Sequence, residues 1–162
     1  MSDNRGPAGA MPVSPSSTVC EMTQIIMPGQ CNSLGTVFGG QVMAWIDICA
    51  AVAAQRFCRG PVVTASMDSL TFEAPVKLGE VMVLRGQVNW AGRTSMETGV
   101  RVEVENMATG ARVHTATAYL TFVAVDDAGK PAPVPVLSPE TQVEKRRFAE
   151  AAERRRQRLA SR

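Results

Sequence analysis

The sequence predicts an α+β domain in which one long helix packs against an antiparallel sheet. A segment over residues 42–54 that is apolar except for one residue is typical of a buried helix. Several later segments have the period and the Val, Thr and Phe content of strands, with only a few residues between them. Such short connections favour hairpins, because a parallel crossover needs about a dozen or more residues.

Length and composition fit one domain with tails. The 162 residues, 45% of them hydrophobic, suffice for one sizeable core but are few for two. A formal net charge of +2 gives little support for a nucleic-acid partner. The four cysteines form no CxxC pair, which favours a reducing compartment. No secretory leader or segment of membrane-spanning length is apparent, so we expect a cytoplasmic protein without a membrane partner.

Composition divides the chain into four parts. Residues 1–18 are rich in Ser, Pro, Gly and Ala, and we expect a disordered arm there. The domain is expected over residues 19–126, followed by a Pro-rich connector over residues 127–138. Residues 139–162 are predicted to form a basic helix capped by Ser138. That helix is either a solvated amphipathic tail, as charge runs usually are, or a holder of a phosphate-bearing ligand through its arginines.

A short strand is expected over residues 20–27, and a loop then leads into the long helix. This helix is predicted to begin near Gly39 or Gly40 and to end around Phe57. It has no polar face, so it requires cover on all sides. One carboxylate, Asp47, interrupts its apolar residues. Burying an ionised carboxylate costs free energy unless a partner or a function compensates.

The remaining strands follow the helix. In the third of them, charged residues alternate with apolar ones, so one face of the sheet is predicted to contact solvent. The four strands are expected over residues 62–73, 81–90, 95–106 and 112–125.

Several kinds of catalytic site can be excluded from the residues that are present. A single histidine, His114, and no GxSxG motif argue against a Ser-His-Asp triad, and we interpret His114 as a hydrogen-bonded strand residue. One histidine and scattered cysteines do not give the spacing of a metal site, and no phosphate-binding GxxxxGK[ST] or GxGxxG loop is present. The candidates that remain are Asn32, Gly39, Gly40 and Asp47.

Each candidate has a chemical role and a structural alternative. A carboxylate in apolar surroundings, as expected for Asp47, can act as a base near neutral pH. The N–H groups of Gly39 and Gly40 at a helix start suit an oxygen that gains negative charge when an acyl carbonyl is attacked. These glycines can also serve only a tight turn, and Asn32 can serve only its own loop.

The spacing of these residues predicts a homodimer. Gly40 and Asp47 are separated by seven positions, or two helical turns, so they lie about 10 Å apart along the axis. One chain is therefore not expected to close its own site. Two chains paired about a twofold axis with antiparallel helices place the loop of each near the carboxylate of the other.

Several motifs together resemble a known family. The pattern N-x2-G-x2-FGG-x6-D over residues 32–47 is followed by VVTASMDSLTF, APVKLGE and GRTSMETGVRVEVEN. This set resembles the hotdog-fold acyl-CoA thioesterases of the acyl-CoA hydrolase family over residues 21–125. The segment GKPAPVPVL and the basic helix after it also resemble bacterial cytosolic members.

The resemblance implies a long helix wrapped by a curved antiparallel sheet, paired as a double hotdog dimer and often assembled as a homohexamer, a trimer of dimers. It also implies a hydrolase that converts fatty acyl-CoA to free fatty acid and coenzyme A, with coenzyme A as part of the substrate and no separate cofactor. The family's catalytic Asn and Asp fall on Asn32 and Asp47 of different protomers, and its oxyanion donor falls on Gly40. The residues expected to contact the coenzyme A moiety are Gly39, Thr64, Gly92, Arg93, Thr94 and Ser95.

Two other functions stay open. A hotdog dehydratase needs a histidine paired with an acid at the site, and His114 is far along the chain from the helix. A non-catalytic acyl-CoA-binding sensor keeps the ligand site without turnover. A sensor acting on DNA also needs a recognition module, and no helix-turn-helix pattern is visible.

Overall fold

The computed structural model of the protein describes residues 10–161. Each expected strand and both expected helices are present, and the ends of the strands and of the long helix differ from the prediction by no more than two residues. The elements in chain order are η1 (Pro15–Thr18), β1 (Cys20–Ile25), η2 (Pro28–Gln30), α1 (Gly39–Cys58), β2 (Val62–Phe72), β3 (Val81–Ala91), β4 (Ser95–Glu105), β5 (Arg112–Ala124) and α2 (Gln142–Ala160), where η denotes a short 3-10 helix.

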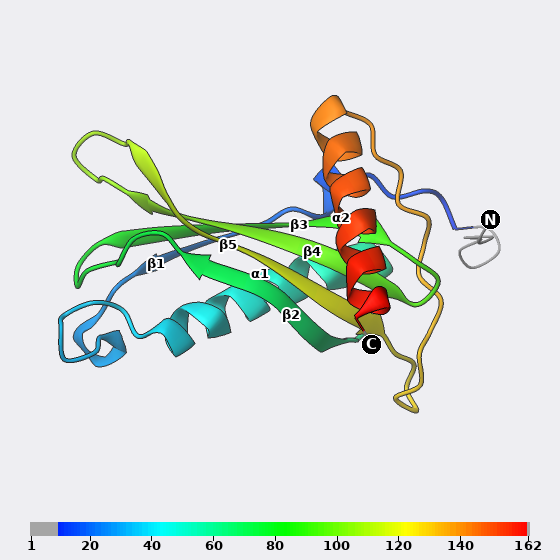
Figure 1. Ribbon diagram of the computed structural model, residues 1–162, viewed down its shortest axis with the longest axis horizontal. Coiled ribbons are helices and arrows are strands. Elements are labelled where there is room, and N and C mark those ends of the chain that lie inside the picture. Colours follow the sequence, from blue (N-terminus) through cyan, green and yellow to red (C-terminus); the bar gives the residue numbers. More distant parts are fainter. Residues whose placement is uncertain (1–9, 162) are drawn as a thin grey trace.

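The strands form one antiparallel sheet in the order β1-β3-β4-β5-β2. The strands that flank α1 in the sequence therefore lie at opposite edges, and α1 crosses the inner face between them (Figure 1). Register shifts leave two extra residues on β2 and one each on β3 and β5, and such irregularities bend strands. The α+β prediction, with a long helix wrapped by a curved sheet, is confirmed.

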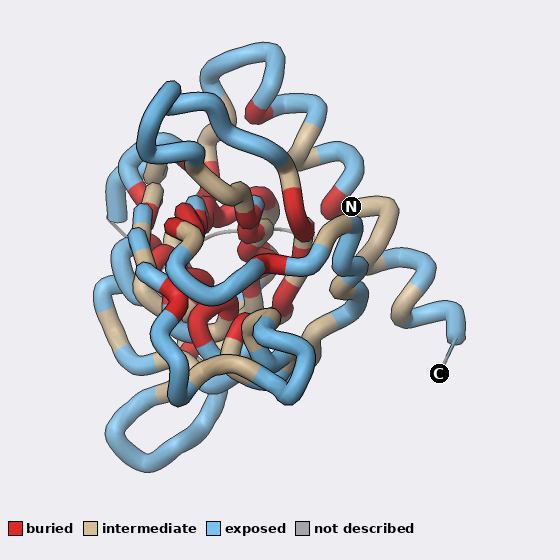
Figure 2. The backbone as a smooth tube through the Cα atoms, turned by 90° about the vertical axis from the view of Figure 1, so that its left-hand side faces the viewer, coloured by how far each residue is buried: buried red, intermediate tan, exposed pale blue. Residues whose placement is uncertain are grey.

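The core lies between α1 and the inner face of the sheet (Figure 2). Alternate residues of β3, such as Leu84 and Val88, face α1 and are fully buried. Gly86 lies in the same row, where a Cβ atom would sit 3.2 Å from the carbonyl oxygen of Cys49. Glycine at this position therefore allows the backbone of α1 to approach β3 closely.

One side of α1 is not covered within the chain. Met43 is 44% exposed and Ile48 is 51% exposed, and Asp47 between them is only half-buried. The expectation that the helix is covered on all sides is wrong for a single chain. The apolar composition of this helix indicates burial in an assembly, which the chain alone does not provide.

The arm expected to be disordered over residues 1–18 contains ordered structure in its described part. Val13 bridges to Leu137 of the connector, and η1 follows. Thr18 is fully buried, and its hydroxyl accepts a hydrogen bond from a β3 backbone N–H at 3.0 Å. The prediction is wrong here because contacts distant in sequence supply the order that composition lacks. Residues 1–9 lie outside the described residues.

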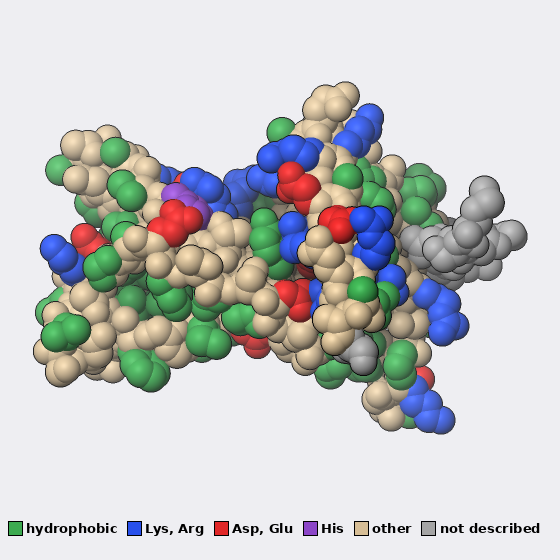
Figure 3. Space-filling view, in the orientation of Figure 1, with side chains coloured by type: hydrophobic (Ala, Val, Ile, Leu, Met, Phe, Trp, Pro, Cys, Tyr) green, Lys and Arg blue, Asp and Glu red, His purple; other side chains and the backbone are tan. Residues whose placement is uncertain are grey.

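Helix α2 begins later than expected and packs against the outer face of the sheet (Figure 1). Its cap is Thr141 rather than Ser138. The Thr141 hydroxyl accepts the Glu144 N–H at 3.2 Å, and the Glu144 carboxylate accepts the Thr141 N–H at 3.0 Å, which is a capping box. Lys and Arg side chains gather along α2 and over the neighbouring sheet surface (Figure 3). The helix is therefore part of the fold rather than a solvated tail.

A buried ion pair joins α2 to the sheet. Glu97, expected on the solvent-facing side of its strand, is only 1% exposed because α2 covers it. The Arg154 guanidinium donates to its carboxylate at 2.7 Å and stacks 3.6 Å from the centre of the Tyr119 ring. Burial raises the pKa of the Glu97 carboxyl, although Arg154 opposes that shift. Glu97 therefore depends on Arg154 for compensation of its charge.

Candidate active site

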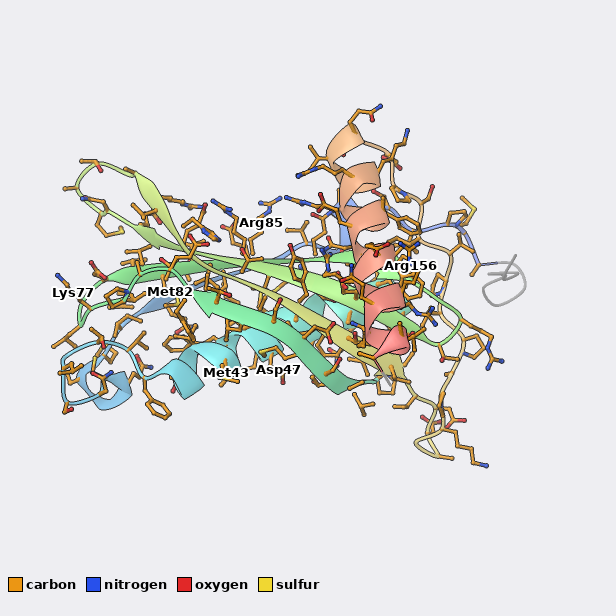
Figure 4. All side chains as sticks on the ribbon, viewed as in Figure 1. Met43, Asp47, Lys77, Met82, Arg85 and Arg156 are labelled. Atoms are coloured by element: carbon orange, nitrogen blue, oxygen red, sulfur yellow. The ribbon has the colours of Figure 1, made fainter. Side chains whose placement is uncertain are left out.

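Asp47 lies on the open side of α1, near Met43 (Figure 4). The Thr64 hydroxyl of β2 donates a hydrogen bond to Asp47 Oδ1 at 2.8 Å. The other carboxylate oxygen, Oδ2, has no hydrogen-bond partner among the described residues. Thr64, expected to contact coenzyme A, is thus placed where it orients the carboxylate. One oxygen is fixed and the other is available to a water or a carbonyl carbon.

Helix α1 begins with two unused donors. No side chain caps its start at Phe38, and no acidic residue lies in its first turn. The N–H groups of Gly39 and Gly40 have no acceptor among the described residues. A Cβ atom on Gly40 would lie 2.6 Å from the ring of Phe38, so a larger residue here requires this exposed ring to move. The helix start can therefore accept an oxygen that carries developing negative charge.

Asn32 organises the loop that precedes α1. Its Oδ1 accepts the N–H groups of Leu34 at 2.9 Å and Thr36 at 3.3 Å, and its Nδ2 donates to the Thr36 hydroxyl at 2.9 Å. The side chain is exposed and makes no hydrogen bond to Asp47 within the chain. The structure therefore fixes the Asn32 amide at the surface but does not bring it to the carboxylate of the same chain.

A cavity of about 300 Å³ lies beside the start of α1. Gly39 lines it, and Val42, Phe72 and Val76 give it mostly apolar walls. Such a cavity suits an acyl chain or another slender apolar group. Asp47 is not part of its lining. The helix start with its cavity and the carboxylate with its threonine thus form two separate halves.

The turn over residues 92–95 joins β3 and β4, at the opposite end of the sheet from the Asn32 loop (Figure 1). Two of its carbonyl groups are hydrogen-bonded to other parts of the chain. The carbonyl of Arg93 accepts the N–H of Val134 at 2.9 Å, and the carbonyl of Thr94 accepts the N–H of Ala124 at 2.9 Å. The Arg93 side chain is exposed. The structure does not bring this turn together with the helix start.

His114 is a hydrogen-bonded strand residue, as expected. Its Nδ1 lies 3.0 Å from Glu73 Oε2 and its Nε2 lies 2.8 Å from the Thr117 hydroxyl. Within residues 10–161, no group of three or more His, Cys, Asp and Glu side chains is arranged to hold a metal ion. None of the described helices is long and apolar enough to span a membrane.

Comparison with known proteins gives consistent matches. The sequence model of the thioesterase superfamily matches residues 34–111. An uncharacterised acyl-CoA thioester hydrolase of Bacillus subtilis is 41% identical over 136 residues, which cover 81% of this chain and 79% of that protein. A hexameric acyl-CoA thioesterase, solved in its apo form, superposes with a TM-score of 0.89 at 41% identity, over 94% of this chain and 97% of its own.

The acyl-CoA hydrolase of Staphylococcus aureus, solved with butyryl coenzyme A, coenzyme A and coenzyme A disulfide, superposes with a TM-score of 0.88 at 38% identity. The match covers 92% of this chain and 91% of that one. Three further structures of that enzyme carry alanine in place of an asparagine, an aspartate and a threonine. Those positions are spaced 15 and 17 residues apart, as Asn32, Asp47 and Thr64 are here. This chain belongs to the thioesterase superfamily, within its hotdog-fold acyl-CoA hydrolase family.

Proposed function

We propose that the protein hydrolyses fatty acyl-CoA thioesters to free fatty acid and coenzyme A. The observation that carries this proposal is the Asp47 carboxylate, held by Thr64 at 2.8 Å with one oxygen left open. Asn32 completes a set with the spacing of three residues that were substituted in the S. aureus acyl-CoA hydrolase. The activity of the family and the matching spacing of the three polar residues thus both support thioester hydrolysis.

The active unit is a homodimer in this proposal. Strand β2 is an edge strand with a free side, and an exposed edge invites pairing with another chain. Val63 on β2 is 50% exposed, next to the open side of α1 with Met43 and Ile48. A second copy placed about a twofold axis covers these apolar side chains and brings its Asn32 loop toward Asp47. The hexameric relative supports assembly as a trimer of dimers.

In the proposed mechanism, the thioester carbonyl oxygen accepts the Gly40 N–H, with Gly39 beside it, at the positive end of the α1 dipole. Asp47 then removes a proton from a water that the partner protomer's Asn32 amide orients, and this water attacks the carbonyl carbon. The carbon–sulfur bond breaks, and the coenzyme A thiolate leaves with the electron pair.

A direct route uses the same residues. Asp47 attacks the carbonyl carbon itself, the thiolate leaves, and water opens the resulting anhydride. Label that enters the Asp47 carboxylate during a single turnover in oxygen-18 water identifies the direct route, because it enters there only when water opens the anhydride at the aspartyl carbon.

We assign the acyl group to the apolar cavity beside Gly39, whose volume is about 300 Å³. The turn of Gly92, Arg93, Thr94 and Ser95 is assigned to the coenzyme A moiety, because Arg93 is exposed there and guanidinium groups suit phosphate oxygens. The protein uses no separate cofactor in this proposal. We place it in the cytoplasm because its four cysteines are free thiols.

The test is release of coenzyme A thiol from a panel of acyl-CoA substrates of increasing chain length, followed with a thiol reagent. We expect turnover with a preference for a limited range of lengths, set by the cavity beside α1. Binding of acyl-CoA without thiol release contradicts the proposal and supports a sensor. Dehydration of a hydroxyacyl-CoA without thiol release contradicts it in favour of a dehydratase.

A further inference from the structure

The apolar cavity beside the start of α1 has a mouth and a floor, which differ in burial. Among its lining residues, Phe72 is 47% exposed and Glu73 is also exposed, so these two lie at the mouth. The lining residues that are at most 2% exposed form the floor, and they are Val42, Val76, Met82 and Thr115. Met82 has the longest side chain of this set. It therefore occupies the most space at the floor.

Met82 reaches the floor from β3. In the sheet its Cα lies opposite Gln24 of β1 on one side and Val104 of β4 on the other, so strands fix its backbone from both sides. Its side chain faces α1, as does that of Leu84 two positions later, because side chains alternate along a strand. Figure 4 shows Met82 near the start of α1. The Met82 side chain therefore separates the cavity from the core of the domain.

Backbone hydrogen bonds hold the walls of the cavity together. The Val37 N–H donates to the carbonyl of Val76 at 2.8 Å, and the Glu73 N–H donates to the carbonyl of Thr115 at 2.8 Å. The Glu73 carboxylate also lies 3.0 Å from His114 Nδ1. Packed protein interiors have low compressibility, so such walls do not widen freely. A longer apolar group therefore requires a floor side chain to move or to be shortened.

We propose that Met82 sets the upper limit on the length of the acyl chain that the protein accepts. This inference rests on the proposed function, in which the thioester carbonyl lies at Gly40 and the acyl group enters the cavity beside Gly39. The chain then runs past Val42 and Val76, and its methyl end meets the Met82 side chain. A longer chain either leaves its last methylenes unburied or holds the carbonyl away from Gly40, and both slow its turnover.

The test compares two methionine-to-alanine variants. Met82→Ala removes the side chain beyond Cβ at the floor of the cavity. Met96→Ala removes the same atoms from β4, where Met96 is also 0% exposed but is not among the residues that line the cavity. Both variants create empty space in the core, so the two changes are matched in chemistry. The new space adjoins the acyl cavity only in Met82→Ala.

The first measurement is the profile of kcat/KM against chain length for straight-chain acyl-CoA substrates. We expect Met82→Ala to move the longest chain that is turned over efficiently upward by about two carbons, with kcat/KM for that chain rising about tenfold or more. Met96→Ala should keep the wild-type profile. A wild-type profile in a folded Met82→Ala protein, or the same shift in both variants, overturns the proposal.

Met82→Val provides the answer if Met82→Ala does not fold. Valine shortens the side chain and favours strands, so this variant should keep the sheet and the wild-type circular dichroism. We expect a smaller shift of the profile toward longer chains. An unshifted profile in this variant contradicts the role of Met82.

Binding without turnover separates this proposal from the proposed function. S-alkyl coenzyme A thioethers carry the chain and the coenzyme A moiety but are not hydrolysed, so calorimetry gives affinity against chain length. We expect wild-type affinity to rise up to a limiting length and Met82→Ala to raise that limit by about two carbons. This result in a protein that releases no thiol from acyl-CoA supports the role of Met82 and contradicts the hydrolase. Thiol release with a limit that Met82→Ala leaves unchanged supports the hydrolase and overturns the role of Met82, as does the absence of a limiting length or of thioether binding in the wild type.

Discussion

The Asp47→Ala variant is expected to lose acyl-CoA hydrolysis, with kcat lowered by about a hundredfold or more. The substitution removes the open carboxylate oxygen that the proposed mechanism uses as base or nucleophile, while leaving the helix start and the apolar cavity in place. KM is expected to change little, because in the proposed mechanism the carboxylate contributes to the transition state rather than to substrate binding. Alanine favours a helix more than aspartate does, so the variant should remain folded. Thiol release and thermal unfolding measure the two effects separately.

Two further variants test whether the loss of activity is specific to the Asp47 carboxylate. Thr64→Val keeps the carboxylate but removes the hydroxyl that orients it, so we expect a smaller loss in kcat, about tenfold. Asp127→Ala removes an exposed aspartate of the connector and should leave kcat unchanged. Wild-type turnover by Asp47→Ala removes the assigned base and nucleophile from the mechanism.

The Arg154→Ala variant is expected to lose about 3–5 kcal/mol of unfolding free energy, because it leaves a buried carboxylate without its partner. Glu97 is 1% exposed and receives the Arg154 guanidinium at 2.7 Å. The substitution also removes the stacking of Arg154 on the Tyr119 ring. Urea unfolding followed by circular dichroism measures the change.

Three comparisons test the cause of this destabilisation. Arg156→Ala removes an exposed arginine of the same helix and should cost less than about 1 kcal/mol. Adding Glu97→Gln to Arg154→Ala removes the unpaired charge and should recover part of the loss. Burial raises the pKa of Glu97, so the folded state takes up a proton before the unfolded state does as the pH falls. The destabilisation should therefore shrink as the pH falls through the raised pKa of Glu97. Equal losses in both arginine variants would contradict a buried-charge effect.

The elements of the fold follow from local signals. Helix α1 is predicted to within one residue because apolar composition and the glycines at its start act over neighbouring positions. The strands are predicted because alternation and turn residues are also local. The separation of Gly40 from Asp47 likewise follows from helical geometry, and it gives the expectation of a shared site.

The contacts between distant elements are not visible in the sequence. Asp47 meets Thr64 only because α1 and β2 pack together, and no local pattern marks that threonine. Glu97 looks solvent-facing within its own strand, but α2 arrives about fifty residues later and buries it. Tertiary packing decides each of these features.

The central claim is that Asp47 of one protomer and Asn32 of its partner form one catalytic site. The most direct measurement is thiol release by an equal, co-expressed mixture of Asp47→Ala and Asn32→Ala chains, each of which should be nearly inactive alone. In a mixed dimer one site loses both residues and the other keeps both. Random pairing should therefore restore about a quarter of wild-type activity. Activity no higher than that of the separate variants would show that both residues act within one chain.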